Sequence, residues 1–250
     1  MTVNRKQVGG NSFITVICDN YATRDDLDVS WGFSCLIKHG GKNILFDTGG
    51  DGIVLLENMS KLGIDPASID LMMISHQHWD HTGGIYHVLS AKRCLPVCLP
   101  YSFSSHFKED MRRYGAELIE VTRAQEILPC LYSTGALDGL ISEQAALLRM
   151  PMGNIVITGC AHPGIINIVK AARKAFPHDK LALVMGGFHL LDADDKTILK
   201  IISQLKKMGV LYAAASHCSG KRARELFALG YKDRFIAVGA GTLIHSGQLR

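Results

Sequence analysis

The sequence predicts an α+β fold built from two similar halves, approximately residues 1–135 and 136–250, whose sheets pack face to face with helices outside. Short apolar runs rich in β-branched residues alternate with segments of helical periodicity. The order of strands, helix and strand occurs twice along the chain. No stretch rich in Pro, Gly and Ser separates the halves, so we expect a single domain.

The first half opens with strands. Residues 13–18 form an apolar run, and residues 33–38 and 43–47 flank a His-Gly-Gly turn, which predicts a hairpin. Helical spacing over residues 53–62 stops at Gly63, as expected for a glycine that ends a helix. Further strands are expected at residues 71–75, 92–99, 118–121 and 131–134, with a helix or loop around residues 104–114.

The second half repeats this order. A strand at residues 154–158 precedes a helix at residues 165–176, which opens with Pro-Gly. A strand at residues 181–185 precedes an amphipathic helix at residues 197–208. The remaining elements are a strand at 211–216, a helix at 221–229 and a last strand at 235–238.

Composition limits the class of protein. Hydrophobic residues make up 47% of the chain and charged residues 20%, which supports a large core and argues against disorder. A net charge of +4 with scattered basic residues argues against a nucleic-acid partner, and no apolar run is long enough to span a membrane. Residues 1–11 lack the apolar core of a signal peptide, and seven cysteines, an odd number, argue against a disulfide framework. We therefore expect a cytoplasmic protein.

The densest group of functional side chains is His76, His78, Asp80 and His81, directly after the apolar strand at residues 71–75. In extended backbone, His76 and His78 point to the same side, and a turn after them brings Asp80 and His81 toward the same place. Imidazole and carboxylate are the ligands that divalent transition metals prefer. Four such groups within six residues argue against unrelated histidines in a polar loop.

Three later histidines also follow strands. His162, His189 and His217 each come at the end of an apolar run. In enzymes built on sheets, ligands gather in the loops at strand ends, so we expect these three to join the same site. Asp47 also ends a strand, and local sequence leaves two roles open: orienting a metal-bound histidine, or capping the helix that follows.

A candidate anion site follows His217. Ser219, Lys221 and Arg222 open the helix expected at residues 221–229, and helix N-termini bind anions. The alternative is that the basic side chains belong to a solvated helix face.

These motifs resemble those of the metallo-β-lactamase fold superfamily. The resemblance rests on the His-rich segment 76–84, on Phe-Asp-Thr-Gly at Asp47 and on the later histidines, and it covers nearly the whole chain. It implies one domain with a four-layer αββα sandwich and two divalent metal ions, with zinc expected and manganese or iron as alternatives. It further implies one metal held by His76, His78 and His162, and a second held by Asp80, His81 and His217. Where many relatives carry a bridging aspartate this chain has His189, which we expect to bind one metal.

The resemblance implies a hydrolase that uses hydroxide from the two-metal site on an ester or phosphoester-like small molecule, with Asp80 as a catalytic residue that orients the nucleophile. Three segments around His162, His189 and His217 resemble a narrower branch, the dihydropterin-ribofuranosylaminobenzene phosphate synthases. That likeness implies as an alternative a transferase that displaces pyrophosphate. A metal-dependent binding or sensor protein without turnover is a further alternative. The expected partner is a small molecule, phosphorylated if residues 219–222 bind an anion; neither nucleic acid nor a membrane is expected, and the oligomeric state stays open.

Overall fold

The computed structural model describes residues 12–249, and within them the first of two sheets has seven strands. In spatial order the strands are β13 (Leu243–His245), β1 (Phe13–Cys18), β2 (Ser34–His39), β3 (Lys42–Phe46), β4 (Leu71–Met73), β5 (Leu95–Pro100) and β6 (Ala116–Val121). Strands β1, β2 and β3 are antiparallel, and β3 to β6 are parallel.

The second sheet has six strands in the described part of the chain. In spatial order the strands are β12 (Val210–Ser216), β11 (Leu181–Gly187), β10 (Asn154–Thr158), β9 (Ala146–Leu148), β8 (Leu131–Ser133) and β7 (Gln125–Leu128). Strands β10, β11 and β12 are parallel, and β7 to β10 are antiparallel.

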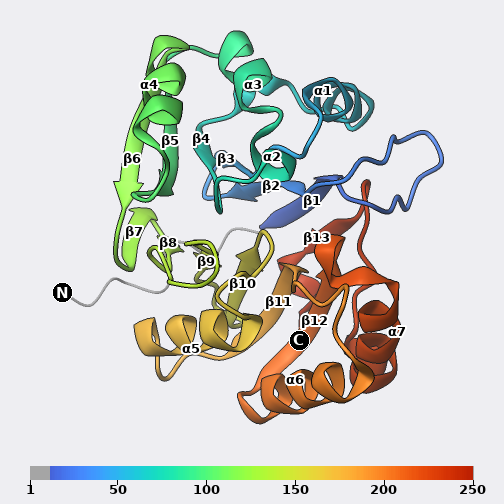
Figure 1. Cartoon of the computed structure of the whole chain (residues 1–250). Helices are drawn as coiled ribbons and strands as arrows, with labels where there is room; N and C mark the ends of the chain where they lie inside the picture. Colours follow the sequence, from blue (N-terminus) through green and yellow to red (C-terminus); the bar gives the residue numbers. More distant parts are fainter. Residues whose placement is uncertain (1–11, 250) are drawn as a thin grey trace.

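Helices cover the outer faces of both sheets (Figure 1). Three apolar clusters fill the three interfaces between these four layers. One lies between the sheets, one packs the first sheet against its helices, and one packs the second sheet against its own. Each fully buried Leu, Ile or Phe contributes about 1.5–3 kcal/mol. The helices are α1 (Gly52–Lys61), α3 (Ile85–Ala91) and α4 (Ser105–Arg113) over the first sheet, and α5 (Ile165–Ala175), α6 (Asp195–Lys207) and α7 (Gly220–Tyr231) over the second.

The αββα sandwich predicted from the sequence is confirmed, and most predicted elements agree within a few residues. Strands β7, β9 and β13, of three or four residues each, were not predicted. The predicted strand at residues 235–238 is wrong. Phe235 forms only an isolated bridge to Ala213, and the chain then leaves the edge of the second sheet. The last strand is β13, which pairs with β1 in the first sheet.

The chain passes from the first sheet to the second between Val121 and Gln125, before residue 135, where the sequence placed the boundary between halves. Strand β13 then returns to the first sheet, so the two sheets do not correspond to two continuous halves. The prediction about a signal peptide concerns residues 1–11, outside the described residues. Within residues 12–249, no helix has the length and apolar character needed to cross a membrane.

Candidate metal centre

The predicted site residues meet where parallel strands of both sheets end. His76 and His78 follow β4, and His162, His189 and His217 follow β10, β11 and β12 in that order. The ring centroids of His76 and His78 lie 4.8 Å apart, and each is within 4.9 Å of His162. The ring of His189 is 4.5 Å from that of His162. The predicted residues therefore form one cluster.

Asp80 and His81 come from the short helix α2 (Trp79–Thr82), which turns the chain after the extended segment. His81 is 4.3 Å from His76 and 5.1 Å from His217, measured between ring centroids. Asp80 Oδ2 lies 3.3 Å from His217 Nε2 and 3.8 Å from His81 Nε2. The ligand atoms of Asp80, His81 and His217 lie within 4.8 Å of one another, as do those of His76 and His162, so the side chains form two adjoining groups.

A buried carboxylate fixes two of the imidazoles. Asp47 Oδ2 accepts hydrogen bonds from Ser75 Oγ and His81 Nδ1, each 2.7 Å long, and Asp47 Oδ1 accepts one from Ser75 N. Because the Ser75 hydroxyl donates to Asp47, it accepts from His76 Nδ1 at 2.9 Å. Both Nδ1 atoms therefore carry a proton, so Nε2 is the nitrogen of His76 and of His81 that is left to bind a metal.

Of the two roles left open for Asp47, the structure places it against His81. The cap of helix α1 belongs to Asp51, whose Oδ1 accepts hydrogen bonds from Ile53 N and Val54 N. Asp47 is fully buried, so its contact with His81 is shielded from water.

His217 and Asp80 are held by two residues that sequence reasoning missed. Asn20 Oδ1 accepts from His217 Nδ1 at 3.0 Å, which directs His217 Nε2 toward Asp80. Trp31 Nε1 donates to Asp80 Oδ2 at 3.0 Å, and the Trp31 ring packs edge-on against His217 at 5.4 Å. Metal-binding histidines usually have this arrangement, in which one ring nitrogen has a hydrogen-bond partner and the other faces the metal.

Burial and neighbouring charges shift the pKa values of the clustered side chains in different directions. Burial and the neighbouring imidazoles lower the pKa of His76 well below its usual range, and burial together with His189 lowers that of His162 to about 4. Burial opposes the charged form of His81, but Asp47 raises its pKa to about 9. Burial would raise the pKa of Asp80, but His217 and His81 hold it far below its usual range. Neutral His76 and His162 beside the ionised carboxylate of Asp80 suit a cation, and His81 must give up a proton to bind one.

The residues present fit a divalent metal. Among residues 12–249, neither ring nitrogen of His162 has a hydrogen-bond partner, although both are shielded from solvent. His76 Nε2 and His78 Nδ1 face each other at 3.2 Å. Two nitrogens on one tetrahedral zinc lie about 3.3 Å apart. The imidazole of His162 thus has no partner and lies beside two nitrogens, of His76 and His78, that have the spacing of ligands on one metal. A metal ion bound among these three side chains explains both observations.

The backbone is strained at four positions around this cluster. Asp47, Ala161, His189 and His217 all have positive φ, between 47° and 61°. Side chains other than glycine rarely adopt this conformation, and such strain concentrates at functional sites.

Glu143 anchors the loop that carries His162, and sequence reasoning missed it. The side chain is fully buried. Its Oε2 accepts from His162 N at 2.8 Å. Its Oε1 accepts from Thr158 Oγ1 and from the backbone N–H groups of Gly159, Cys160 and Ala161, at 2.9–3.1 Å. This carboxylate therefore sets the loop conformation.

We expect Glu143→Ala to lower the free energy of unfolding by about 3–5 kcal/mol, because five buried donors lose their acceptor. Glu143→Gln keeps Oε1 and loses only the bond from His162 N, so it costs less, about 1–3 kcal/mol. Urea unfolding of the metal-free proteins measures both. Equal stability of the alanine variant and wild type would contradict this role.

Two buried thiols adjoin His189, which is itself exposed. Cys160, His189 and Cys218 offer ligand atoms within 4.8 Å of one another. The hydrogen bond to Cys218 and burial raise the pKa of the Cys160 thiol well above its usual range. Burial would raise the pKa of Cys218, but hydrogen bonds from Cys160 and His189 lower it well below. His189 therefore contacts the thiols as well as His162.

The residues of the predicted anion site are engaged in other contacts. Ser219 is buried, and its Oγ accepts from Phe188 N at 3.0 Å. Arg222 is paired with Asp195 at 2.5 Å and with Glu225 at 3.2 Å. Lys221 is exposed. The anion-binding role stays a prediction, and of the two basic side chains Arg222 already has carboxylate partners.

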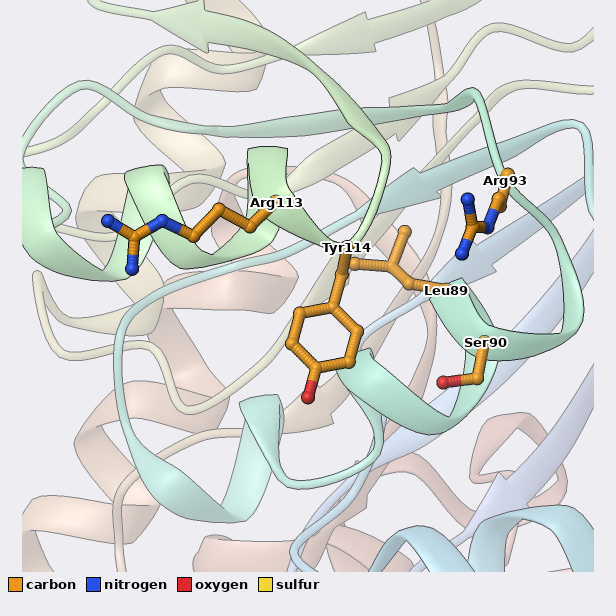
Figure 2. A pocket seen from close by; sticks show the side chains of 5 residues that line it. All are labelled: Leu89, Ser90, Arg93, Arg113 and Tyr114. Atoms are coloured by element: carbon orange, nitrogen blue, oxygen red, sulfur yellow. The ribbon is translucent and has the colours of Figure 1, made fainter.

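A surface cavity between α3 and α4 lies outside this cluster. It is lined by Leu89, Ser90, Arg93, Arg113 and Tyr114, and Tyr114 and Leu89 lie between the two arginines (Figure 2). Arg113 is already paired with Glu109 and Asp110. Because its lining includes no His, Cys or carboxylate, this cavity has no reactive group to match the histidine cluster.

A four-layer αββα sandwich with a cluster of candidate metal ligands at the strand ends defines the class of protein. Residues 32–217 match the family model described as the metallo-β-lactamase superfamily. The chain therefore belongs to this superfamily, whose members typically bind metal ions and are mostly metal-dependent hydrolases.

Within the superfamily, the chain is similar to the following individual proteins. A 7,8-dihydropterin-6-methyl-4-(β-D-ribofuranosyl)-aminobenzene-5′-phosphate synthase from Methanocaldococcus jannaschii is 29% identical over 247 residues, covering 81% of this chain and 84% of the relative. An uncharacterised protein from the same organism is 26% identical, covering 92% and 99%. A solved metal-dependent hydrolase of the β-lactamase superfamily is 28% identical with a TM-score of 0.81, covering 93% of this chain and 98% of that chain.

Proposed function

We propose that the protein is a metal-dependent hydrolase that acts on an ester or phosphoester bond of a small molecule at a site for two divalent cations, with zinc the first candidate and manganese or iron as alternatives. The observation that carries the proposal is the orientation of His76, His81 and His217. Each has a partner on Nδ1 and presents Nε2 to the centre of the cluster.

His76, His78 and His162 would hold one cation, and Asp80, His81 and His217 the other, with His189 as a further ligand. When bound, such cations lower the pKa of a water toward neutrality and polarise a carbonyl or phosphoryl oxygen. Asp80, ionised and held by Trp31, has its carboxylate facing His217 and His81. In our proposal it orients the attacking nucleophile as well as binding metal.

A second candidate is a transferase that displaces pyrophosphate from a dihydropterin diphosphate. The relative named as a synthase, with 29% identity over most of both chains, favours it. Both reactions develop negative charge on oxygen, so one cationic site serves either.

The test uses protein purified without nickel or chelator and then loaded with zinc, manganese or iron. The hydrolase proposal predicts metal-dependent turnover of 4-nitrophenyl acetate or bis(4-nitrophenyl) phosphate that is lost in His76→Ala. Pyrophosphate release from a dihydropterin diphosphate and an aromatic amine, without ester hydrolysis, would favour the transferase. Metal binding without turnover of any substrate would favour a binding or sensor protein.

Substituting His189 tests its place in the site. We expect His189→Ala to lower bound metal from about two ions per chain to about one, because a ligand is lost. Plasma mass spectrometry on both proteins measures this. Exposed His106 in α4, changed to alanine, is the control and should keep the wild-type content. Unchanged metal content in His189→Ala would remove His189 from the ligand set.

A further inference from the structure

The thiol of Cys160 lies between the two groups of candidate ligands. Its side chain is 3% exposed, and its Sγ is 3.2 Å from His81 Nε2. Cys160 belongs to one set of mutually close ligand atoms with Asp80, His81 and His217, and to another with His76 and His162. Among the described residues, it alone is common to both sets.

The spacing suits coordination. A thiolate sulfur and an imidazole nitrogen on one tetrahedral zinc lie about 3.5 Å apart, since Zn–S is about 2.3 Å and Zn–N about 2.0–2.1 Å. The 3.2 Å between Cys160 Sγ and His81 Nε2 is close to that value. A thiolate is a strong ligand for zinc and related metals, and sulfur has enough lone pairs to bind two ions.

The backbone around Cys160 is fixed on both sides. Its N–H donates to Glu143 at 3.0 Å, and its carbonyl oxygen accepts from Cys218 Sγ at 3.6 Å. A Cβ at Gly159 would collide with Ser75 Oγ, and one at Gly187 would lie 2.6 Å from Cys218 Sγ. Glycine at both positions lets the strands close around the thiol, which keeps Cys160 between the two groups.

We propose that Cys160 is a metal ligand whose thiolate is shared by the two cations. This inference rests on the metal site of the proposed function. On binding, the S–H bond breaks, the proton passes to solvent and the sulfur binds metal, with no change of oxidation state.

Cys218 is the natural comparison. It is as buried as Cys160, but it belongs only to the set with Cys160 and His189. It is absent from both groups that would hold the cations. Cys218→Ser therefore removes a neighbouring buried thiol without removing the shared ligand, and it is the matched control for Cys160→Ser.

The test is titration of the metal-free protein with cobalt(II). Wild type and Cys218→Ser should show a near-ultraviolet sulfur-to-cobalt charge-transfer band together with visible ligand-field bands. Cys160→Ser should lose the charge-transfer band and keep the ligand-field bands, which also shows that the variant is folded. A charge-transfer band that persists in Cys160→Ser would overturn the proposal. Ligand-field bands without a charge-transfer band in wild type would overturn the Cys160 proposal and leave the metal site of the proposed function standing. An absence of cobalt binding in wild type would contradict the metal site itself.

X-ray absorption on the Cys218→Ser protein loaded with two zinc ions separates sharing from binding at one ion. A shared thiolate gives about one sulfur per zinc at about 2.3 Å, and a terminal thiolate gives about half that. The half value would overturn the sharing, and an absence of sulfur would overturn the ligand.

Discussion

We expect Asp80→Asn to lower kcat/KM for the proposed metal-dependent hydrolysis of an ester or phosphoester by about 10³-fold, the middle of the range for loss of a group that acts on the nucleophile. Asparagine matches aspartate in size, and its amide oxygen still accepts from Trp31 Nε1. The change removes the negative charge beside His81 and His217. Because the proposed mechanism uses that charge to orient the nucleophile, kcat should fall far more than KM rises.

Trp31→Phe is the control for Asp80→Asn. Phenylalanine keeps a ring against His217 but removes the hydrogen bond to Asp80. Loss of such a supporting contact costs about 10-fold. If Asp80→Asn kept activity within 10-fold of wild type, Asp80 would have no direct role in the reaction.

We expect Asp47→Asn to weaken metal binding by about 10–100-fold, which is the usual effect of removing the carboxylate behind a metal-binding histidine. The asparagine amide N–H group would face His81 Nδ1, which now donates to Asp47 Oδ2. His81 can satisfy that donor only by moving its proton to Nε2, which blocks the nitrogen that faces the cluster. Competition titration with a chromophoric chelator measures the affinity.

Asp51→Asn separates this effect from loss of a helix cap. Asp51 caps α1 by accepting hydrogen bonds from Ile53 N and Val54 N. Asparagine is an equally good cap, so stability and metal affinity should stay close to wild type. Weakened metal binding in Asp51→Asn would contradict the role given to Asp47. Metal affinity equal to that of wild type in Asp47→Asn would also contradict it.

The pair of Asp47 and His81 makes the stability of the metal-free protein depend on pH. His81 has a pKa of about 9, above its value in the unfolded chain of about 6.5. A raised pKa adds stability that is fully present below pH 6.5 and is lost as the pH rises through 9. The contribution is roughly 3 kcal/mol. Urea unfolding between pH 6 and 10 should show this loss in wild type and a much weaker one in Asp47→Asn; equal slopes would contradict it.

The sequence predicts the ligand cluster because its signals are local. His76, His162, His189 and His217 each follow an apolar run, and parallel strands end on one edge of a sheet. The strand prediction at residues 235–238 was wrong because it, too, used only local signals. Its apolar pattern is local, whereas a strand requires a partner, and here only Phe235 meets one.

The supporting residues could not be predicted because their partners are distant in sequence. Asn20 is 197 positions from His217, and Trp31 is 49 from Asp80. Glu143 lies in an irregular segment, where an isolated glutamate is usually a surface residue. Asp47 had two local interpretations, and only the fold brings it to His81.

The most direct test of the central claim is a crystal structure of the zinc-loaded protein with anomalous scattering recorded on both sides of the zinc absorption edge. We expect two anomalous peaks, one among His76, His78 and His162 and the other among Asp80, His81 and His217. A single peak in the cluster would contradict the dinuclear site, and the absence of any peak there would contradict the assignment of these residues as metal ligands.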